Sequence, residues 1–248
     1  MLYNCENVDL FSLNRELKKR DKLMMNLLFP AWKNRGLFMN TNLILMTLLC
    51  IVGGYLIGSI PFALVIGKVF YKTDLRQHGS GNPGGTNAGR VLGKKAGIAV
   101  IVLDVLKVVL AIGLSSLVSG PAALLSGLAC CIGHCYPVFA HFKGGKAVAT
   151  MFGFLLGVSI FVFANAFYFL CPLIMFFLML YLYKWVSLAS IAAAVSSSLL
   201  IIAMNWSMSI ESVLLICGSW LLTLLVIYRH SLNIEKIRNG KESKISWM

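Results

Sequence analysis

Charged residues are scarce in this chain of 248 residues. They make up 12% of the sequence, whereas hydrophobic residues make up 58%. Soluble domains average about 25% charged and about 45–50% apolar residues, so this composition excludes most of them, together with disordered and collagen-like chains. Acidic residues are fewest: nine, against 22 lysines and arginines, for a net charge of +13. So much positive charge in so apolar a chain favours an anionic membrane face or an anionic substrate over nucleic acid.

The chain also lacks the cysteine spacing of a disulfide framework. Its seven cysteines lie mostly in apolar runs, which indicates small, reduced hydrophobic residues. The cluster Cys130, Cys131, His134 and Cys135 has no second Cys/His cluster of matching spacing elsewhere, so we predict no metal site. The pattern G-x-x-x-x-G-K-[ST] does not occur in the glycine-rich loop, so nucleotide hydrolysis is not supported.

Long apolar stretches dominate the sequence instead. A membrane-spanning helix needs about 20 mostly apolar residues, because every backbone polar group must be satisfied inside the lipid. Seven stretches meet or nearly meet this length, although 121–139 and 146–163 are short or interrupted by Gly, Pro and His. We therefore predict an all-α integral membrane protein, a bundle of about seven transmembrane helices with short re-entrant or broken segments lining a cytoplasm-facing site. The seven stretches are 43–66, 96–118, 121–139, 146–163, 165–183, 186–204 and 211–228.

Lysine and arginine occupy alternate connections between these stretches. The connections near 119–120, 164 and 205–210 contain none. The positive-inside rule therefore places the other connections, and the C-terminus, in the cytoplasm. The cationic segments are 67–95, 140–145, Lys184 and the tail that begins at Arg229.

The first 39 residues conflict with this orientation. They carry seven lysines and arginines but would lie outside, and they lack the apolar core and cleavage site of a signal peptide. We interpret 1–39 as a basic N-terminal extension, either a dispensable segment from a mis-assigned start or a short amphipathic piece on the membrane surface. Residues 40–248 are then a single polytopic membrane domain, and a chain starting at Met39 is expected to retain activity.

Two polar insertions have the composition of anion-binding loops. Segment 74–95 holds five glycines between Gly79 and Gly89, flanked by arginines and lysines. Glycine tolerates positive φ and lets successive N–H groups converge on an anion, although a flexible loop has the same composition. Segment 142–150 places two glycines and two lysines before an apolar stretch, where backbone donors, helix dipole and cationic side chains suit phosphate. An ordinary positive-inside loop is the alternative.

Ionisable residues also occur inside or at the ends of the apolar stretches. Asp104 and Lys107 are three residues apart and share one helical face. Such groups cost roughly 2.5–3.5 kcal/mol each to insert, so we expect them to face the bundle interior and line a site, or to brace helices as an ion pair. His134 and His230 are candidates for acid–base or hydrogen-bonding roles.

A series of short polar and glycine-containing blocks runs through the chain. The blocks are Gly58-Ser59-Ile60-Pro61-Phe62, Asp74-Leu75-Arg76, Gly79-Ser80-Gly81-Asn82-Pro83-Gly84 with Thr86-Asn87, Asp104 and Lys107, Gly133-His134 with Pro137 and Phe139, Phe142-Lys143-Gly144-Gly145-Lys146, Arg229-His230 with Asn233-Ile234, and Gly240 with Glu242. These blocks, in this order, resemble the bacterial acyl-phosphate:glycerol-3-phosphate acyltransferase family, the PlsY type. The resemblance covers roughly residues 45–245.

The resemblance implies an inner-membrane enzyme without metal or cofactor. Such an enzyme transfers a fatty acyl group from acyl phosphate to the 1-hydroxyl of sn-glycerol 3-phosphate, releasing phosphate and lysophosphatidate, in the first committed step of phospholipid synthesis. Its expected partners are glycerol 3-phosphate, acyl phosphate and membrane lipid, with no nucleic acid and with functional coupling to the enzyme that makes acyl phosphate. Ser59 and Arg76 match the first essential loop, Gly144–Lys146 the glycerol-3-phosphate loop, and His230, Asn233 and Glu242 the third.

The residues suit that reaction on chemical grounds. Acyl phosphate carries a good leaving group, so the site needs positioning and charge stabilisation more than a strong nucleophile. We expect direct attack by the glycerol hydroxyl, with a histidine or a substrate phosphate oxygen accepting the proton. The expected catalytic residues are Ser59, Arg76, Lys107, His230 and Asn233. The expected substrate-binding residues are Gly79, Ser80, Gly81, Asn82, Gly84, Thr86, Asn87, Asp104, His134, Lys143, Gly144, Gly145, Lys146 and Glu242.

One departure from the family pattern concerns Ala147, which stands where the family has glycine. A Cβ at this position would crowd the loop if the backbone there needs positive φ.

Two other functions are compatible with part of the sequence. A transporter or channel for an anionic metabolite would also use an intramembrane ion pair and basic loops, but the polar motifs lie on one predicted face and no inverted repeat is visible. A CDP-alcohol type of lipid enzyme needs clustered aspartates, and the few acidic residues here are scattered.

Overall fold

The computed structural model describes residues 41–207 and 209–245, and every regular element within them is helical. The predicted extension 1–39 lies outside the described residues. Three short α-helices, α3 (Phe62–Tyr71), α4 (Gly85–Val91) and α11 (Ser231–Arg238), and two 3-10 helices, η2 (Leu75–Gln77) and η3 (Val138–Ala140), lie between or after the long ones. The long helices are α2 (Thr41–Gly58), α5 (Lys94–Ser116), α6 (Gly120–Cys135), α7 (Val148–Phe161), α8 (Phe167–Tyr183), α9 (Val186–Met204) and α10 (Ile210–Arg229).

The seven predicted stretches overlap these seven helices, although 43–66 runs past the end of α2 into α3. Within 41–207 and 209–245, five segments are long and apolar enough to cross a membrane, and the prediction of an all-α integral membrane protein is confirmed. α7 and α8 fall short of that length. With 14 residues, α7 rises only about 21 Å, because an α-helix rises about 1.5 Å per residue. The five long segments are Thr41–Tyr71, Lys94–Ser116, Gly120–Ala140, Val186–Met204 and Ile210–Arg229.

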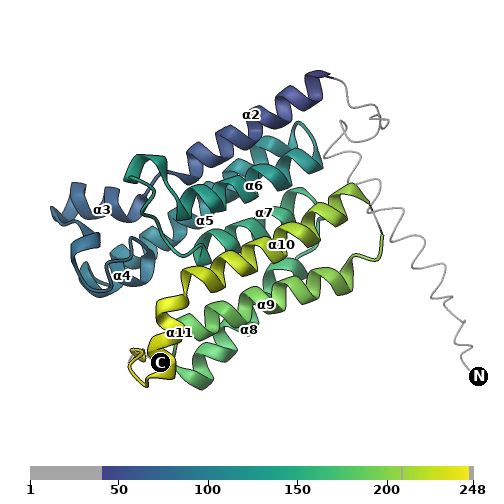
Figure 1. Ribbon diagram of the computed structural model, residues 1–248. Coiled ribbons are helices and arrows are strands. Elements are labelled where there is room, and N and C mark those ends of the chain that lie inside the picture. The colour runs from purple at the N-terminus through teal and green to yellow at the C-terminus, as the bar shows by residue number, and fades with distance from the viewer. Residues whose placement is uncertain (1–40, 208, 246–248) are drawn as a thin grey trace, which may run out of the picture. The chain divides into compact units, whose positions relative to one another are not determined.

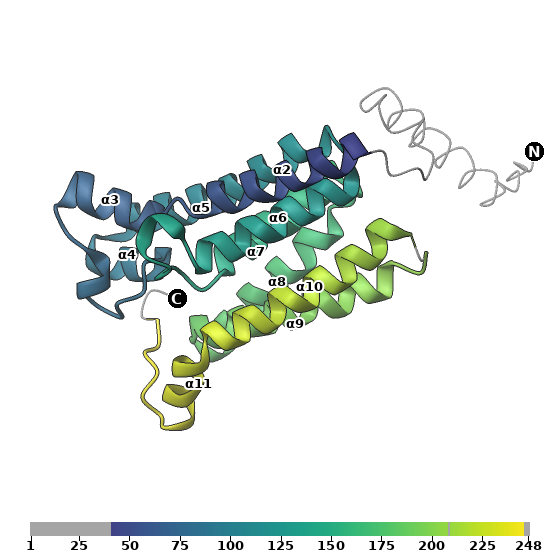
Figure 2. The same cartoon turned by 45° about the horizontal axis from the view of Figure 1, so that its top comes forward.

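The helices pack side by side as an up-and-down bundle (Figure 1). α6 is central to it, because it packs against α2, α5, α7 and α10. α8, α9 and α10 gather on one side of the bundle, as Figure 2 shows, with α9 packed against both α8 and α10. α7 contacts α5, α6 and α8 and so joins the two sides of the bundle.

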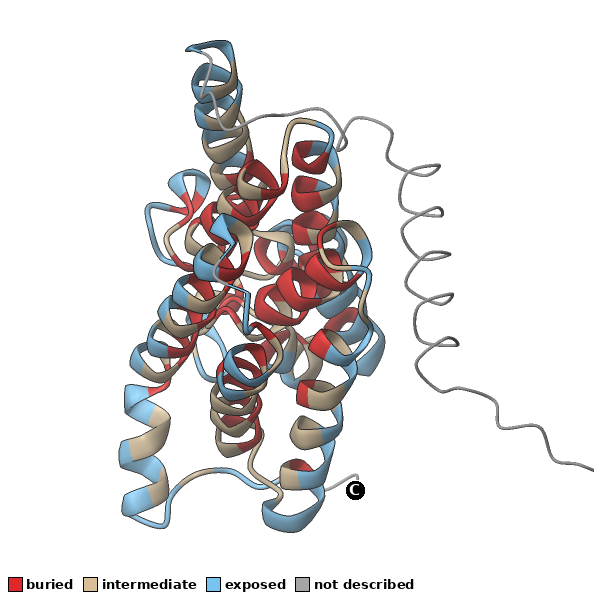
Figure 3. Ribbon diagram, turned by 90° about the vertical axis from the view of Figure 1, so that its right-hand side faces the viewer, coloured by how far each residue is buried: buried red, intermediate tan, exposed pale blue. Residues whose placement is uncertain are grey.

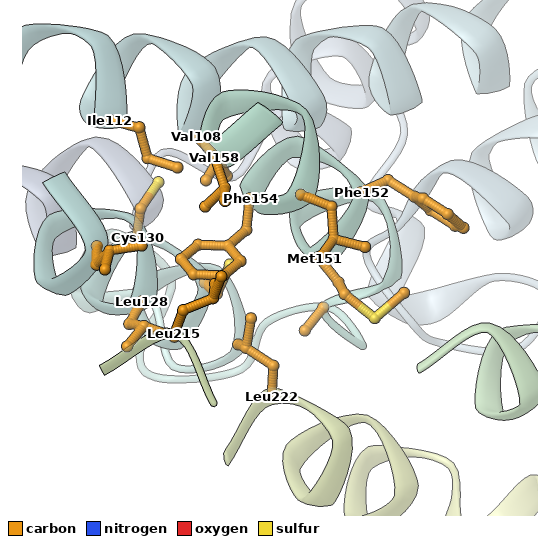
Figure 4. Close-up of a cluster of buried hydrophobic side chains, with 14 of the residues drawn as sticks. Val108, Ile112, Leu128, Cys130, Met151, Phe152, Phe154, Val158, Leu215 and Leu222 are labelled. Carbon is orange, nitrogen blue, oxygen red and sulfur yellow. The ribbon is translucent and has the colours of Figure 1, made fainter. Parts of the chain in front are cut away.

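Apolar side chains fill the interior and also cover the outside of the bundle. Buried residues concentrate at its centre, as Figure 3 shows. In the close-up of Figure 4, Phe154 of α7 meets side chains from α5, α6 and α10. Large apolar residues such as Leu45, Leu110 and Ile174 are exposed on the outside, where a transmembrane bundle meets lipid tails. The six described cysteines are free, and Cys130, Cys131 and Cys135 are fully buried in the core, as small hydrophobic residues are.

All the polar insertions lie at one end of the bundle, which we call the loop end. It comprises residues 59–93, 136–147, 184–185 and 230–245. α3, α4 and α11 mark this end in Figure 1. The connections at the opposite end, within 117–119, 162–166, 205–207 and residue 209, contain no lysine or arginine.

Candidate active site

The first loop presents an arginine that is fixed by an aspartate two residues earlier. The Arg76 guanidinium donates from Nε to Asp74 Oδ1 at 3.0 Å and from Nη2 to Oδ2 at 2.6 Å. The Asp74 carboxylate also accepts the backbone N–H of Arg76 and so caps η2. These bonds lower the pKa of Asp74 to about 2 and raise the pKa of Arg76. Arg76 is thus a permanent cation in a set position, with 28% of its side chain exposed.

Asn87 on α4 determines the conformation of the glycine-rich part of this loop. Its Nδ2 donates to the carbonyls of Leu75 at 3.1 Å and His78 at 3.0 Å, and its Oδ1 accepts the N–H of Ser80 at 2.9 Å. Both amide hydrogens are therefore used within the protein, so in this conformation Asn87 braces the loop. Gly79 and Gly81 have positive φ, as a phosphate-binding loop was expected to require. Of the other residues expected to bind substrate here, Ser80 and Thr86 are exposed and Asn82 and Gly84 are half-buried.

A buried polar cluster lies behind this loop, between α5, α6 and the junction of α2 with α3. Lys107 and Asp104 form an ion pair of 2.8 Å, with side chains only 2% and 3% exposed. The Lys107 ammonium also contacts the Ile60 carbonyl and His134 Nδ1, both at 3.1 Å. Ser59, next to Ile60, is fully buried, and its hydroxyl has no hydrogen-bond partner among the described residues.

The Gly-Gly-Lys loop is packed against the end of α6. The N–H groups of Gly144 and Gly145 donate to the carbonyls of Cys135 and His134, at 3.2 Å and 3.0 Å. A Cβ on Gly144 would overlap the His134 carbonyl, and a Cβ on Gly145 would overlap the His134 ring. These two N–H groups are therefore engaged within the protein and do not point at an anion, contrary to the expectation for backbone donors there. The first N–H groups of α7 and the Lys146 side chain remain suited to that role.

Arg229, at the end of α10, holds the same loop from the other side. Its guanidinium donates to the carbonyls of Gly144 at 2.7 Å and Gly145 at 3.0 Å, and it stacks over the Tyr136 ring at 5.6 Å. Arg229 is not among the site residues predicted from the sequence. The signals available for it were the block Arg229-His230 of the family resemblance and its place at the start of the cationic tail.

Lys146, at the start of α7, connects this loop to the C-terminal segment. Its Nζ donates to Asn233 Oδ1, and Asn233 Nδ2 in turn donates to Glu242 at 2.8 Å. Glu242 also accepts from Ser187 on α9 at 2.8 Å, a contact that nothing in the sequence indicated. Burial lowers the pKa of Lys146, and the charges of Lys236, Arg229 and Arg90 of α4 lower it further. The second loop and the C-terminal segment therefore meet at Lys146.

His230 lies beside this cluster in a neutral form. It is 3% exposed, and burial lowers its pKa to about 4. Its Nδ1 lies 2.8 Å from the Val226 carbonyl, which can only accept, so Nδ1 carries the hydrogen. The second ring nitrogen, Nε2, then keeps a lone pair and can accept a proton.

Lys143 is exposed and contributes positive charge at the rim of the loop end. The structure thus brings together Lys146 of the second loop with His230, Asn233 and Glu242 of the C-terminal segment, and Asp104 and Lys107 of α5 with His134 of α6. Among the described residues, Arg76 is paired with Asp74 and makes no hydrogen bond or ion pair with either group. No three metal-ligating side chains cluster anywhere in 41–207 or 209–245.

The fold and the site together define a multi-pass integral membrane protein with a cluster of cationic side chains at one end of its helical bundle. The family described as glycerol-3-phosphate acyltransferase matches residues 48–240. The chain belongs to this family, in its PlsY form.

Individual relatives and solved structures are similar over most of the chain. The glycerol-3-phosphate acyltransferase of Listeria welshimeri is 46% identical over 215 residues, covering 85% of this chain and 100% of that protein. The one of Bacillus cytotoxicus is 44% identical over 202 residues, covering 81% and 96%. The crystal structure of PlsY (YgiH), an integral membrane glycerol 3-phosphate acyltransferase, in its glycerol 3-phosphate form matches with a TM-score of 0.72 at 35% identity, over 81% of this chain and 96% of that one. Its lysophosphatidic acid form matches with a TM-score of 0.70 at 34% identity, over 81% and 95%.

Proposed function

We propose that this protein transfers a fatty acyl group from acyl phosphate to the 1-hydroxyl of sn-glycerol 3-phosphate. The products are lysophosphatidate and inorganic phosphate. Membership of the glycerol-3-phosphate acyltransferase family supports the acceptor, as do the two substrate and product forms of the similar PlsY structure. The observation that carries the proposal is the meeting of Lys146, Asn233 and His230 at the loop end, where a phosphorylated acceptor can bind beside a neutral base.

Lys146 is the proposed partner of the glycerol 3-phosphate phosphate group. It is half-buried, and its one side-chain hydrogen bond among the described residues goes to Asn233, so two of its three hydrogens can reach a ligand. The N-terminus of α7 adds the positive end of a helix dipole to the same place. Glu242 and Asn233 hold the lysine side chain in position, which limits the entropy lost when the anion binds.

Arg76 and Ser59 are the proposed partners of the acyl phosphate. A cavity of about 410 Å³ lies between α3 and η3, and its lining combines Arg76 and Lys68 with apolar side chains. An acyl chain with a phosphate at one end matches that combination of charge and apolar surface. The donor would reach the cavity laterally from the lipid. The lining residues are Pro61, Leu64, Val65, Lys68, Val69, Arg76, Phe139, Ala140 and His141.

His230 is the proposed proton acceptor. The hydroxyl oxygen of glycerol 3-phosphate attacks the acyl carbonyl carbon, and the bond from that carbon to the phosphate oxygen breaks. The phosphate leaves with the electron pair, and the hydroxyl proton passes to His230 Nε2 and then to the departing phosphate. Because His230 is neutral with a free Nε2, it has the form that general base catalysis requires.

We propose that the loop end faces the cytoplasm. Every described connection that carries lysine or arginine lies at that end, which is the pattern of the positive-inside rule. The enzyme that makes acyl phosphate would then supply the donor from the same side, and residues 40–248 would act as one membrane acyltransferase domain.

The test uses the full chain purified in detergent, supplied with glycerol 3-phosphate and palmitoyl phosphate. We expect stoichiometric release of phosphate and lysophosphatidate, and no product when palmitoyl-CoA replaces the donor. Ser59→Ala and Arg76→Ala should abolish turnover. Arg238→Ala is the matched control, because Arg238 is an exposed arginine on α11 at the same end. Absence of lysophosphatidate in the unsubstituted protein would overturn the proposal, and equal activity of all three variants would overturn the site assignment.

A further inference from the structure

The Lys107 ammonium is enclosed by groups of the protein. It forms an ion pair with Asp104 Oδ1 at 2.8 Å and contacts the Ile60 carbonyl and His134 Nδ1, both at 3.1 Å. A lysine ammonium has three donors and no acceptor. Lys107 is 4% exposed, so its ammonium is not accessible to a substrate. Lys107 thus links the segment that contains Ser59 to the end of α6. A residue in this position acts on the site through its neighbours.

The contact with Lys107 determines which nitrogen of His134 carries hydrogen. Because the ammonium can only donate, Nδ1 must accept, and a neutral imidazole then carries its hydrogen on Nε2. Asp104 Oδ1 is farther from Nδ1, at 3.5 Å. Within the described residues Nε2 makes no hydrogen bond, although His134 is only 7% exposed.

His134 Nε2 points at the Gly-Gly-Lys loop. A Cβ on Gly145 would overlap this atom. The absence of a side chain at Gly145 therefore makes room for the Nε2 side of the His134 ring. Lys146 follows directly in the chain, and Gly145 itself is held by Arg229. An N–H that has no partner in the protein and lies against a cationic loop is suited to an anion that binds there.

We propose that His134 donates a hydrogen bond from Nε2 to the anion bound at the Gly144–Lys146 loop, and that Lys107 with Asp104 is the positioning pair that fixes this tautomer. The proposal rests on the proposed function in taking the anion to be the phosphate of glycerol 3-phosphate. It revises the expected role of Lys107, which becomes a positioning residue and does not touch the reacting atoms. It also gives the two buried histidines opposite tasks, since His134 offers a hydrogen and His230 offers a lone pair.

The tautomers can be observed directly by ¹⁵N NMR of the full chain labelled at its histidine rings. The four histidine signals are assigned by single substitutions. We expect hydrogen on Nε2 for His134 and on Nδ1 for His230. Hydrogen on Nδ1 of His134, donated to Asp104, or a charged imidazolium would overturn the proposal. This readout does not depend on turnover, so it separates the proposal from the proposed function.

Two substitutions of His134 distinguish the nitrogens chemically. The amide nitrogen of glutamine reaches the place of Nε2, whereas that of asparagine reaches the place of Nδ1. We expect His134→Gln to bind glycerol 3-phosphate within about threefold of the unsubstituted protein, and His134→Asn to bind it at least about tenfold more weakly, as the loss of a hydrogen bond to a charged group implies. Binding is measured calorimetrically without donor. His78→Gln is the control, because His78 is exposed. Equal binding by the two His134 variants, or weaker binding by the glutamine variant, would contradict the proposal.

The double variant Asp104→Asn/Lys107→Met tests the positioning pair. It removes both charges together, so no unpaired ion is left in the apolar interior. We expect a mixture of His134 tautomers and weaker glycerol 3-phosphate binding. The fold-decrease in kcat at saturating acceptor should be smaller than the fold-increase in KM. A loss confined to kcat, with the Nε2 tautomer retained, would show that Lys107 acts on the reaction itself and would overturn its role as a positioning residue.

Discussion

Ala147 combines a left-handed backbone with full burial. Its φ is +60° and its ψ is 8°, at the position before α7 begins. A Cβ in this conformation costs about 1–2 kcal/mol relative to glycine, because it approaches the following carbonyl oxygen. The sequence analysis expected a Cβ here to crowd the loop if the backbone needed positive φ. The backbone at Ala147 does have positive φ.

We therefore predict that Ala147→Gly raises the free energy of unfolding by about 1 kcal/mol, measured by thermal unfolding in detergent. Ala164→Gly is the matched control. Ala164 also has positive φ, 48°, but it is exposed at the opposite end of the bundle. Both variants should gain stability, and only Ala147→Gly should change the affinity for glycerol 3-phosphate. A loss of stability in Ala147→Gly would show that the Cβ packs more favourably than its backbone strain costs.

His230 gives the stability a pH dependence. Burial lowers its pKa from the ordinary value of 6.5 to about 4, so between these values the unfolded chain binds a proton that the folded chain does not. The part of the free energy of unfolding that depends on neutral His230 is therefore fully present above about pH 6.5 and is lost as the pH falls toward 4. Its upper limit is about 3 kcal/mol, at about 1.4 kcal/mol per pKa unit.

The measurement compares the unsubstituted protein with His230→Asn between pH 4 and 7. Asparagine can keep a donor for the Val226 carbonyl but does not titrate. We expect the unfolding temperature of the unsubstituted protein to rise more steeply with pH across this range. Parallel curves for the two proteins would mean that His230 is not held neutral by burial.

At the scale of the helices, glycines allow α2 and α6 to approach closely. Gly54 and Gly58 lie one turn apart on α2 and face Ser126 and Cys130 of α6. A Cβ on either glycine would overlap the backbone of α6. Helices in lipid associate through such small residues, because burial of apolar side chains gives little advantage there.

Gly53 and Gly54 provide a matched pair to test this contact. They are adjacent on the same helix, but a Cβ on Gly53 meets nothing within 4 Å. We predict that Gly54→Leu lowers the free energy of unfolding by at least about 1–3 kcal/mol through overpacking, whereas Gly53→Leu leaves it unchanged or slightly raised. Thermal unfolding in detergent measures both. Equal effects of the two substitutions would mean that α2 and α6 are not in close contact.

The positions of the helices could be predicted from the sequence, but their contacts could not. Apolar length identified all seven helices, since a run such as 186–204 has no other stable form in lipid. The same signal does not distinguish the face of α2 that meets α6 from the face that meets lipid, because both are apolar. The GxxxG spacing of Gly54 and Gly58 was available in the sequence and indicates such a face.

The residues of the candidate site could likewise be predicted from the sequence only in part. Residue types and spacing indicated Lys146, Asn233 and Glu242, and the fold brings these residues together. Their supporting partners could not be predicted. Ser187 stands in an apolar helix with no motif around it, and the bracing of the first loop by Asn87 depends on how η2 and α4 pack. The tautomers of His134 and His230 follow from single contacts that only the folded chain creates.

At the scale of the described bundle, the lysines and arginines of the connections and the proposed reaction lie at one end. The loops around Asn82 and Lys146 both lie there, so two phosphorylated substrates could meet. At the opposite end, the described connections carry no lysine or arginine. A soluble acceptor can then bind from water, while an acyl chain enters from the lipid at the level of α3 and η3.

The proposed orientation predicts which positions react with a membrane-impermeant thiol reagent in intact bacteria. With the native cysteines replaced, single cysteines are introduced at Trp206, which is 88% exposed at one end, and at Lys95 and Arg238, which are exposed at the loop end. Only Trp206→Cys should be labelled in intact cells, and all three after permeabilisation. Because the positive charges of the loops set the orientation, a chain starting at Met39 should give the same pattern. Labelling of Lys95→Cys in intact cells would place the loop end outside, away from a cytoplasmic supply of acyl phosphate. Labelling that differs between Lys95→Cys and Arg238→Cys would mean that the first and third loops lie on different sides of the membrane.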